Sequence, residues 1–378
     1  MSAATSSMTP HRSALDVRGD FPYAGECVYL NTAGAGLSWR GQGAAAASFY
    51  DGPKSRGLNG MADWRAQADE ARARLARLFD VSTAEIRFAA STTEGLYLSL
   101  GAIPFEDGDE IVVAADEFPS VLAACANAPR AAVALNKVAV PNEASREAAL
   151  LDAITTKTRA VALSHVHWVT GTRINLDRVA AACRRVDATL VVDGAQALGA
   201  IPMALGATAL YSASVFKWLV SGFGLAVLIV RDGASGTLEP VVRGYNNAAP
   251  SRELQYSHVN YPGIHALSGS LAYLEQLGWD RIYAQVDALW LELHASLAAL
   301  NIDVVTPATA HAGIISCKVP DAATIKNALA GEHVYVEERA GLLRVSPHFY
   351  NTSDDIAAFI ERLDRLRQRP TSYRSNHA

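Results

Sequence analysis

Cysteine is scarce in this sequence, and its arrangement excludes two common kinds of scaffold. The 378 residues contain four cysteines, with no Cys-x-x-Cys pair and no Cys/His spacing of the kind that binds zinc: Cys27, Cys125, Cys183 and Cys317. We therefore expect reduced thiols, no disulfide framework and no bound metal.

An excess of positive charge and a long apolar run are also absent. The formal net charge is -5, which offers no basic surface for a nucleic-acid backbone. No segment reaches membrane-spanning length, and the first twenty residues lack the apolar core of a secretion signal. We expect a cytoplasmic protein that acts on a small molecule and binds neither nucleic acid nor a membrane.

Alternating apolar and helical segments are what the sequence does contain. Half of the residues are hydrophobic, enough for a large core and two domains. Between Ala84 and about Val230, short apolar runs alternate with helical stretches such as 176–186, a pattern typical of strand–helix units on a mainly parallel sheet. The predicted strands of this α/β fold cover residues 86–90, 110–114, 132–140, 160–164, 189–193, 209–212 and 225–230.

The pattern changes after Pro262. A long helical run over 264–300 precedes a strand at 312–319, a helix at 322–330, strands at 334–337 and 342–346, and a final helix at 354–368. We therefore predict an N-terminal segment (1–30) that joins the small domain, a large domain (31–262) and a small α+β domain (263–378).

Lys217 and Asp193 carry the strongest chemical signal. An amine attacks an aldehyde only when deprotonated, and an acidic partner for the pyridine nitrogen turns pyridoxal phosphate (PLP) into an electron sink. Asp193 ends an apolar strand, so its carboxylate should emerge at the carboxyl edge of the sheet, where such folds bind ligands. Alone, Asp193 could cap a helix and Lys217 could be a surface lysine. Together they predict a PLP enzyme.

Three further features follow strands of the same predicted sheet. Residues 91–95, Ser-Thr-Thr-Glu-Gly, open a helix, so they could cradle a phosphate or simply cap the helix. Phe118 could stack on a ring or belong to the core. Gln196 could donate to the phenolic oxygen of the cofactor or lie in a solvated turn. Their shared position after strands supports a single site.

Seven motifs resemble those of the class V aminotransferase-like PLP enzymes, which include cysteine desulfurases, selenocysteine lyases, isopenicillin N epimerase-like proteins and kynureninases. They lie between about Tyr29 and Leu366: Val-Tyr-Leu-Asn-Thr-Ala-Gly, Ser-Thr-Thr-Glu-Gly, Glu-Phe-Pro-Ser, Ser-His-Val-His-Trp-Val-Thr-Gly-Thr, Val-Asp-Gly-Ala-Gln, Ser-Val-Phe-Lys-Trp-Leu and Leu-Leu-Arg-Val-Ser-Pro-His-Phe-Tyr-Asn-Thr. The resemblance implies a PLP-dependent transferase fold of the aspartate aminotransferase-like type, with a mainly parallel seven-stranded sheet. It also implies a homodimer and an amino-acid substrate.

The resemblance implies roles for individual residues. Lys217 would form the Schiff base, Asp193 would pair with the pyridine nitrogen, and His165 rather than His167 would face the cofactor as a third catalytic residue. Further cofactor contacts are implied for Thr92, Thr93 and Ser214 at the phosphate, Phe118 on the ring and Gln196 at the phenolic oxygen. Substrate contacts are implied for Arg344 at the α-carboxylate and for Ala33 and Trp168.

Three positions depart from the family pattern. Phe216 stands where a phosphate-binding histidine is common, and Trp168 stands where desulfurases have an asparagine. The Gly-Thr pair that a neighbouring subunit usually contributes is replaced around Ser257 and His258. We hypothesise that one of these two residues reaches the phosphate across a dimer interface, although His258 could equally be a loop histidine with no ligand.

The absence of a cysteine at one position reduces the number of possible reactions. Desulfurases carry a mobile cysteine just before the segment of the carboxylate-binding arginine, but residues 336–344 here contain none, and Cys317 lies in an apolar run. A persulfide mechanism is therefore not expected. The first choice is a lyase that eliminates a β-substituent from a cysteine-type substrate, by C–S or C–Se cleavage. Transamination, epimerisation at Cα and a non-catalytic PLP-binding regulator are the alternatives.

Overall fold

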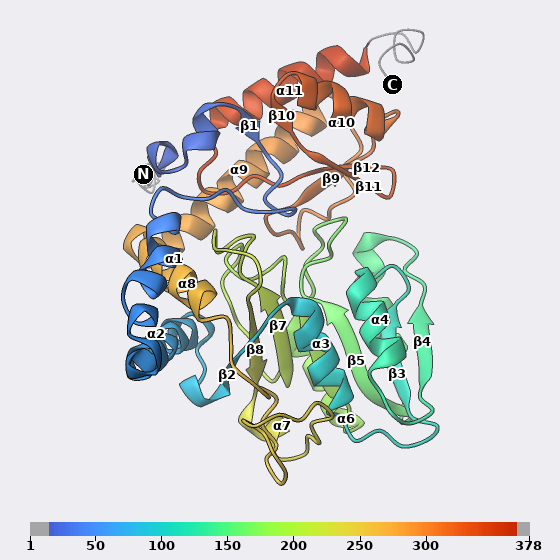
Figure 1. The fold of residues 1–378 in the computed structure, drawn as a ribbon. Coiled ribbons are helices and arrows are strands. Elements are labelled where there is room, and N and C mark those ends of the chain that lie inside the picture. The colour runs from blue at the N-terminus through green and yellow to red at the C-terminus, as the bar shows by residue number, and fades with distance from the viewer. Residues whose placement is uncertain (1–14, 369–378) are drawn as a thin grey trace, which may run out of the picture.

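A seven-stranded sheet forms the centre of the larger part of the molecule (Figure 1). The computed structural model describes residues 15–368, and its strands follow the order β2–β8–β7–β6–β5–β3–β4. The predicted strands are confirmed, with ends that differ by at most two residues: β2 Ile86–Ala89, β3 Glu110–Ala114, β4 Ala134–Val138, β5 Thr158–Ser164, β6 Thr189–Asp193, β7 Leu210–Ser214 and β8 Ala226–Val230.

The direction of these strands gathers several carboxyl ends at one edge. β8 pairs antiparallel with β2 and β7, and the remaining pairs are parallel. Residues in β6, β7 and β8 are almost entirely buried, as expected for strands covered by helices on both faces. The ends of β2, β5, β6 and β7 therefore meet at the edge where open α/β folds bind ligands.

Helices cover the two faces of the sheet. Helices α3 and α4 share one core with the residues of one sheet face, including Val191. Helices α2 and α6 pack in a second core with the opposite face, including Leu190 and Val192. The bounds in this part are α1 Gln42–Asp51, α2 Met61–Phe79, α3 Thr92–Gly101, α4 Pro119–Asn127, α5 Arg146–Asp152, α6 Leu176–Arg185 and α7 Asp232–Ser235.

A smaller α+β part lies beside the carboxyl edge of the sheet (Figure 1). Its three-stranded sheet has the order β11–β12–β9, and β1 of the N-terminal segment pairs with β10 in parallel. The elements are β1 Val28–Tyr29, α9 Trp279–Ala299, β9 Ile315–Cys317, α10 Ala322–Gly331, β10 Val334–Tyr335, β11 Glu337–Arg339, β12 Leu342–Val345 and α11 Ser353–Arg367.

Three sequence expectations were wrong in this region. The long helix expected over 264–300 is two helices, because Gly278 has a φ of +88°, a conformation that ends α8 (Tyr261–Leu277) before α9 begins. The strand expected over 312–319 is limited to β9. The strand expected over 334–337 is divided between β10 and β11, which pair with different partners.

Packing divides the chain at a different place from the change in sequence pattern at residue 262. Helix α8 packs into the core of the large sheet through residues such as Ile264 and Leu271, whereas Leu289 and Trp290 of α9 pack with Leu30 in a separate core. The three-part division stays a prediction, and residues 1–14 and 369–378 lie outside the described residues. Within 15–368, no helix has both the length and the apolar character needed to cross a membrane.

Candidate active site

A cavity of about 180 Å³ lies at the carboxyl edge of the large sheet. The structure brings eight of the residues predicted from the sequence to its wall: Thr92, Thr93, Phe118, Trp168, Asp193, Gln196, Ser214 and Lys217. They come from the ends of β2, β3, β5, β6 and β7, or from the loops and helix starts that follow these strands. One cavity therefore collects side chains that are widely separated in the sequence.

Lys217 is half-buried, and its amine has no hydrogen-bonding partner among residues 15–368. Its Nζ lies 5.5 Å from the centroid of the Phe216 ring. Burial lowers the pKa of Lys217 to about 8; the carboxylate of Asp193 opposes this shift, and the charge of Arg344 adds to it. A larger fraction of this amine is therefore neutral near pH 7 than of an exposed lysine, and the neutral amine is the nucleophile.

The backbone around Lys217 is held by the loop that follows β1. Gly36 N donates to Phe216 O at 3.0 Å. A Cβ atom on Gly36 would lie 2.0 Å from the carbonyl oxygen of Lys217. Only glycine permits this approach, so the Asn-Thr-Ala-Gly-Ala-Gly stretch fixes the position of the lysine.

Asp193 faces the same cavity from the end of β6. Its Oδ1 accepts from Ala195 N at 2.9 Å, and its Oδ2 has no hydrogen bond among the described residues. Burial raises the pKa of Asp193 to about 6, while the hydrogen bond from Ala195 and the charge of Lys217 lower it. A cationic N–H group in the cavity would pair with Oδ2 and favour the ionised carboxylate.

Hydroxyl groups and helix-terminal amides gather at one end of the cavity. Thr92 Oγ1 lies 2.6 Å from Ser214 Oγ, and Thr93 Oγ1 donates to Ser120 Oγ at 2.8 Å. Ser91 caps α3 by accepting from Glu94 N, while the first amides of the helix have no partner within it. Free amides, a favourable helix dipole and four hydroxyls suit a bound phosphate group.

Ser120 is a cavity residue to which the sequence reasoning assigned no role. It lies in the first turn of α4, where Pro119 occupies the first helical position and Phe118 precedes it. The signal was present, because a proline and a serine after a strand mark a helix start as clearly as Ser-Thr-Thr does before α3.

Arg344 and Ala33 lie next to the cavity wall rather than in it. Arg344 is buried in β12, its Nη1 donates to Trp168 O at 2.7 Å, and its Nε has no partner. An unpaired buried guanidinium nitrogen is available for a carboxylate. Ala33 contributes its backbone oxygen, which accepts from Gln196 Nε2 at 3.0 Å.

His165 lies outside the cavity wall, contrary to the expected contact with the cofactor. Ser164, Val166 and Trp168 line the cavity, so His165 and His167 point to the other side of this segment. His165 Nδ1 lies 3.3 Å from the hydroxyl of Tyr211, and burial lowers the pKa of His165 to about 3. Residues two positions apart lie on the same side of an extended segment, so alternation does not separate His165 from His167 as expected.

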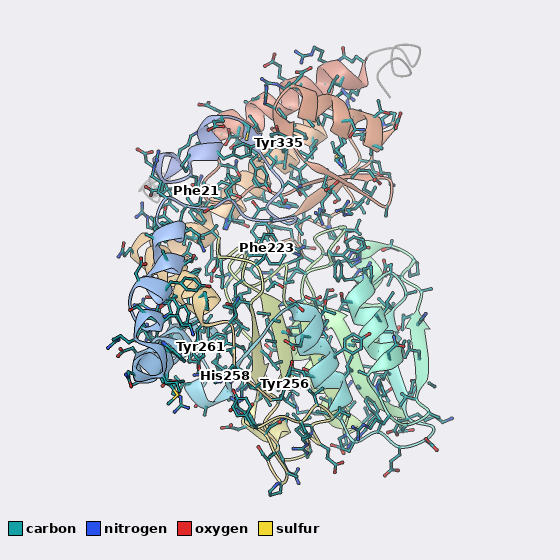
Figure 2. All side chains as sticks on the ribbon, viewed as in Figure 1. Phe21, Phe223, Tyr256, His258, Tyr261 and Tyr335 are labelled. Atoms are coloured by element: carbon teal, nitrogen blue, oxygen red, sulfur yellow. The ribbon has the colours of Figure 1, made fainter. Side chains whose placement is uncertain are left out.

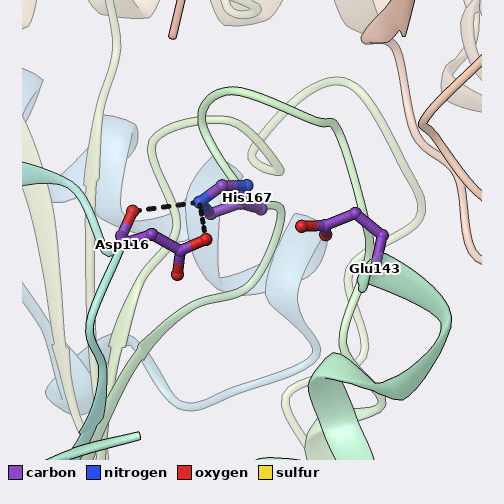
Figure 3. Close-up of side chains that lie close together, drawn as sticks. All are labelled: Asp116, Glu143 and His167. Carbon is purple, nitrogen blue, oxygen red and sulfur yellow. Dashed lines mark hydrogen bonds and ion pairs between the residues drawn. The ribbon is translucent and has the colours of Figure 1, made fainter. Parts of the chain in front are cut away.

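His167 belongs to a charged cluster with Asp116 and Glu143 (Figure 3). Its Nε2 lies 3.2 Å from Asp116 O, which also accepts from Trp168 Nε1. The buried guanidinium of Arg146 donates to both carboxylates at 2.6–3.0 Å, so this cluster already contains its cation. The cluster joins the loop before Phe118 to the segment of Trp168.

Ser257 and His258 line a different pocket of about 230 Å³, shared with Arg65 and Arg72 of α2. Figure 2 shows His258 and Tyr261 well away from Phe223, which stacks on Phe216 of the cavity wall. Within one chain, Ser257 and His258 therefore do not join the other predicted cofactor residues.

A mainly parallel sheet with a half-buried lysine, a buried aspartate and a group of hydroxyls at its carboxyl edge is an arrangement that suits an enzyme that uses PLP. The sequence model of the class-V aminotransferases matches residues 44–359, and the chain belongs to this family. It is a PLP-dependent enzyme.

The chain is also similar to individual proteins in sequence and in structure. The chain is 25% identical to a probable cysteine desulfurase of Methanothermobacter thermautotrophicus over 93% of this chain and 97% of the relative. It is 28% identical to a probable hercynylcysteine sulfoxide lyase of Mycobacterium tuberculosis, over 78% of each chain. The apo structure of a cysteine desulfurase from Thermococcus onnurineus NA1 superposes with a TM-score of 0.84 at 22% identity, covering 97% of this chain and all of the other.

The cavity fits this cofactor. The free Oδ2 of Asp193 suits a protonated pyridine nitrogen, the hydroxyls of Thr92 and Ser214 suit a phosphate, and the unpaired Nζ of Lys217 suits an aldehyde. Phe118 and Ala195 supply apolar surface for the ring. When bound, PLP supplies an aldehyde that captures an amine and a ring that accepts the electrons left by a departing proton.

Proposed function

We propose that the protein is a lyase that cleaves a C–S or C–Se bond of a cysteine-type amino acid by β-elimination, without a persulfide on the protein. The observation that supports this proposal is the position of the four thiols. None of them lines the cavity, and all are buried. Burial raises the pKa of Cys125, Cys183 and Cys317 to about 12, so these thiols stay protonated and unreactive.

The hairpin that carries Arg344 also supports a mechanism without a persulfide on the protein. Arg339 pairs with Leu342 across β11 and β12, so the connecting turn has only two residues, Ala340 and Gly341. Both have positive φ values, as in a tight type I′ turn. A turn of this length holds no mobile loop on which a cysteine could take sulfur from the substrate.

The residues of the chain can perform the steps of an elimination. Arg344 would bind the substrate α-carboxylate and so hold the Cα–H bond within reach of Lys217. Lys217, displaced by the substrate amine, would take the proton from Cα as general base. The C–S bond then breaks, the thiolate leaves with the electron pair, and hydrolysis of the remaining fragment yields pyruvate and ammonia. The Mycobacterium tuberculosis relative described as a lyase supports this choice.

The experiment that tests the proposal compares products rather than loss of substrate. Purified protein is incubated with a panel of L-amino acids that includes cysteine conjugates and sulfoxides. Pyruvate together with a released thiol is the expected outcome. A new keto acid with the carbon skeleton of the substrate would identify a transaminase, solvent deuterium at Cα without cleavage would identify an epimerase, and no turnover would favour a regulator.

Replacing Arg344 with alanine should mainly weaken substrate binding. Loss of a shielded bidentate contact costs about 2 to 4 kcal/mol, so the substrate concentration for half-maximal rate should rise roughly 30-fold to 900-fold. Arg339→Ala is the matched control, because Arg339 lies on the same hairpin, is partly exposed and pairs with Glu337. Unchanged half-saturation in Arg344→Ala would assign the carboxylate to another cation, with Arg243 and Arg56 tested next.

We also propose that the working unit is a homodimer in the cytoplasm, with Ser257 or His258 contacting the phosphate of the partner's cofactor. Their separation from the cavity of their own chain supports this arrangement. Apolar side chains that a second copy could cover are exposed on several elements, and Tyr245 among them shares the pocket of Ser257 and His258: Tyr50, Leu58, Phe223 and Tyr245.

Mixing two inactive variants tests the shared site. Lys217→Ala subunits are combined with subunits that carry Ser257→Ala and His258→Ala. A mixed dimer then has one site with both defects and one site with neither, so activity should partly return. Subunit exchange is verified by mass spectrometry of differently tagged chains. No recovery in verified mixed dimers would reject contact across the interface.

A further inference from the structure

Trp218, the residue after the cavity lysine, is buried and touches the side chain of Gln196. Its Nε1 donates to Gln196 Oε1 at 3.0 Å. On the other side, Gln196 Nε2 donates to Ala33 O at 3.0 Å. An indole N–H can only donate and a backbone carbonyl can only accept, so these two partners together fit one orientation of the amide and reject the flipped one.

This orientation decides what Gln196 presents to the cavity. Gln196 lines the cavity, and its Nε2 has two hydrogens, of which Ala33 takes one. The second N–H is the donor that remains. A phenolic oxygen of the cofactor would therefore meet a hydrogen-bond donor, and a donor stabilises the ionised form of such an oxygen.

Both neighbours of Gln196 are held by the segment that follows Arg344. His348 Nε2 donates to Trp218 O at 2.9 Å, and Ala33 N donates to Ser346 Oγ at 3.0 Å. Gly313 makes room for the indole, because a Cβ atom there would lie 2.4 Å from the Trp218 ring. Burial lowers the pKa of His348 to about 3, so His348 is neutral and this support does not change near neutral pH.

We propose that Trp218 is a positioning residue that fixes the Gln196 amide with its N–H group toward the phenolic oxygen of PLP. The proposal rests on the contact between Gln196 and that oxygen and does not depend on which reaction follows. If Trp218 lost its N–H, Gln196 Oε1 would be buried without a partner, and the amide would no longer have a single favoured orientation.

The test follows the pH midpoint at which the visible absorbance of the bound cofactor changes, in the holoenzyme without substrate. Gln196→Met should raise this midpoint by about one pH unit or more, because the donor is lost. Trp218→Phe, which keeps most of the buried ring, should raise it in the same direction and by a smaller amount. Trp218→Phe in the Gln196→Met background should add nothing, because Trp218 acts through Gln196.

Trp290→Phe is the matched control. Trp290 is equally buried and its Nε1 also donates, to Ile314 O at 2.8 Å, but it lies in the core of the small part. It should leave the midpoint unchanged. The proposal is overturned if Gln196→Met leaves the midpoint unchanged, if Trp218→Phe in a folded protein does so, or if Trp218→Phe shifts it equally in the Gln196→Met background. Failure of the lyase assay would leave all of these spectra unaffected.

Discussion

Lys217→Ala should abolish covalent attachment of the cofactor and reduce turnover to the background level. Among the described residues Lys217 is the only lysine in the wall of the cavity, and alanine offers no amine to react with the aldehyde or to take the proton from Cα. The measurement is treatment with borohydride followed by mass spectrometry of the intact chain. Wild-type protein should gain the mass of the reduced cofactor, whereas the variant should not.

Lys318→Ala is the control for this experiment, since Lys318 is exposed and pairs with Asp303 at the surface. It should behave like the wild type. A Lys217→Ala chain that still gains the mass of the cofactor would show that another lysine holds it. The fold should survive the substitution. Burial lowers the pKa of Lys217, so its protonated amine at pH 7 destabilises the apo protein. Removal of this amine should therefore leave the melting temperature of the apo protein unchanged or higher.

Asp193→Asn should retain the cofactor but lose at least about two orders of magnitude in turnover, the effect of removing one partner from a buried charge pair. A neutral amide cannot hold the pyridine nitrogen protonated, so the ring loses its capacity to accept electrons. Single-turnover rates at saturating substrate measure the loss. Asp187→Asn is the control, because Asp187 has a fully exposed side chain. Near-normal rates in Asp193→Asn would mean that another acid serves the ring or that the ring is not used as an electron sink.

The same variant makes a prediction about pH and stability. The pKa of Asp193 is raised in the folded apo protein, from 3.8 to about 6, so folding favours its protonated form. That contribution is fully present below about pH 4 and is lost as the pH rises through 6. The apo Asp193→Asn protein, which cannot ionise there, should therefore melt higher than the apo wild type above pH 6 and not below pH 4.

Much of the fold could be predicted because its strands are buried on both faces. Continuous apolar runs located β6 and β8, and strand ends located Asp193 and the lysine loop. The break between α8 and α9 was missed although Gly278 marks it, because the hydrophobic period continues across the glycine. Periodicity reports which face a residue occupies but not where the backbone changes direction.

The site residues at strand ends could be predicted from the sequence. The side of the segment on which a given side chain lies could be predicted less well. Alternation could not distinguish His165 from His167, because residues two apart share a side, and nothing in the sequence indicates that Val166 and Trp168 face the cavity instead. The contact between Trp218 and Gln196 was not predicted, since it joins residues 22 positions apart through one N–H group and no sequence pattern marks it. The role proposed for Ser257 and His258 would depend on a second copy of the chain, which no single sequence describes.

The burial of all four cysteines has a practical consequence for work with this enzyme. Every thiol is at most 8% exposed, and burial raises the pKa of each one, so alkylating and disulfide reagents should find no thiolate on the native chain. A thiol-reactive dye can therefore follow a sulfur-containing product in real time without inhibiting or labelling the enzyme. Once the chain unfolds, four thiols become reactive together, and the same dye then reports on stability.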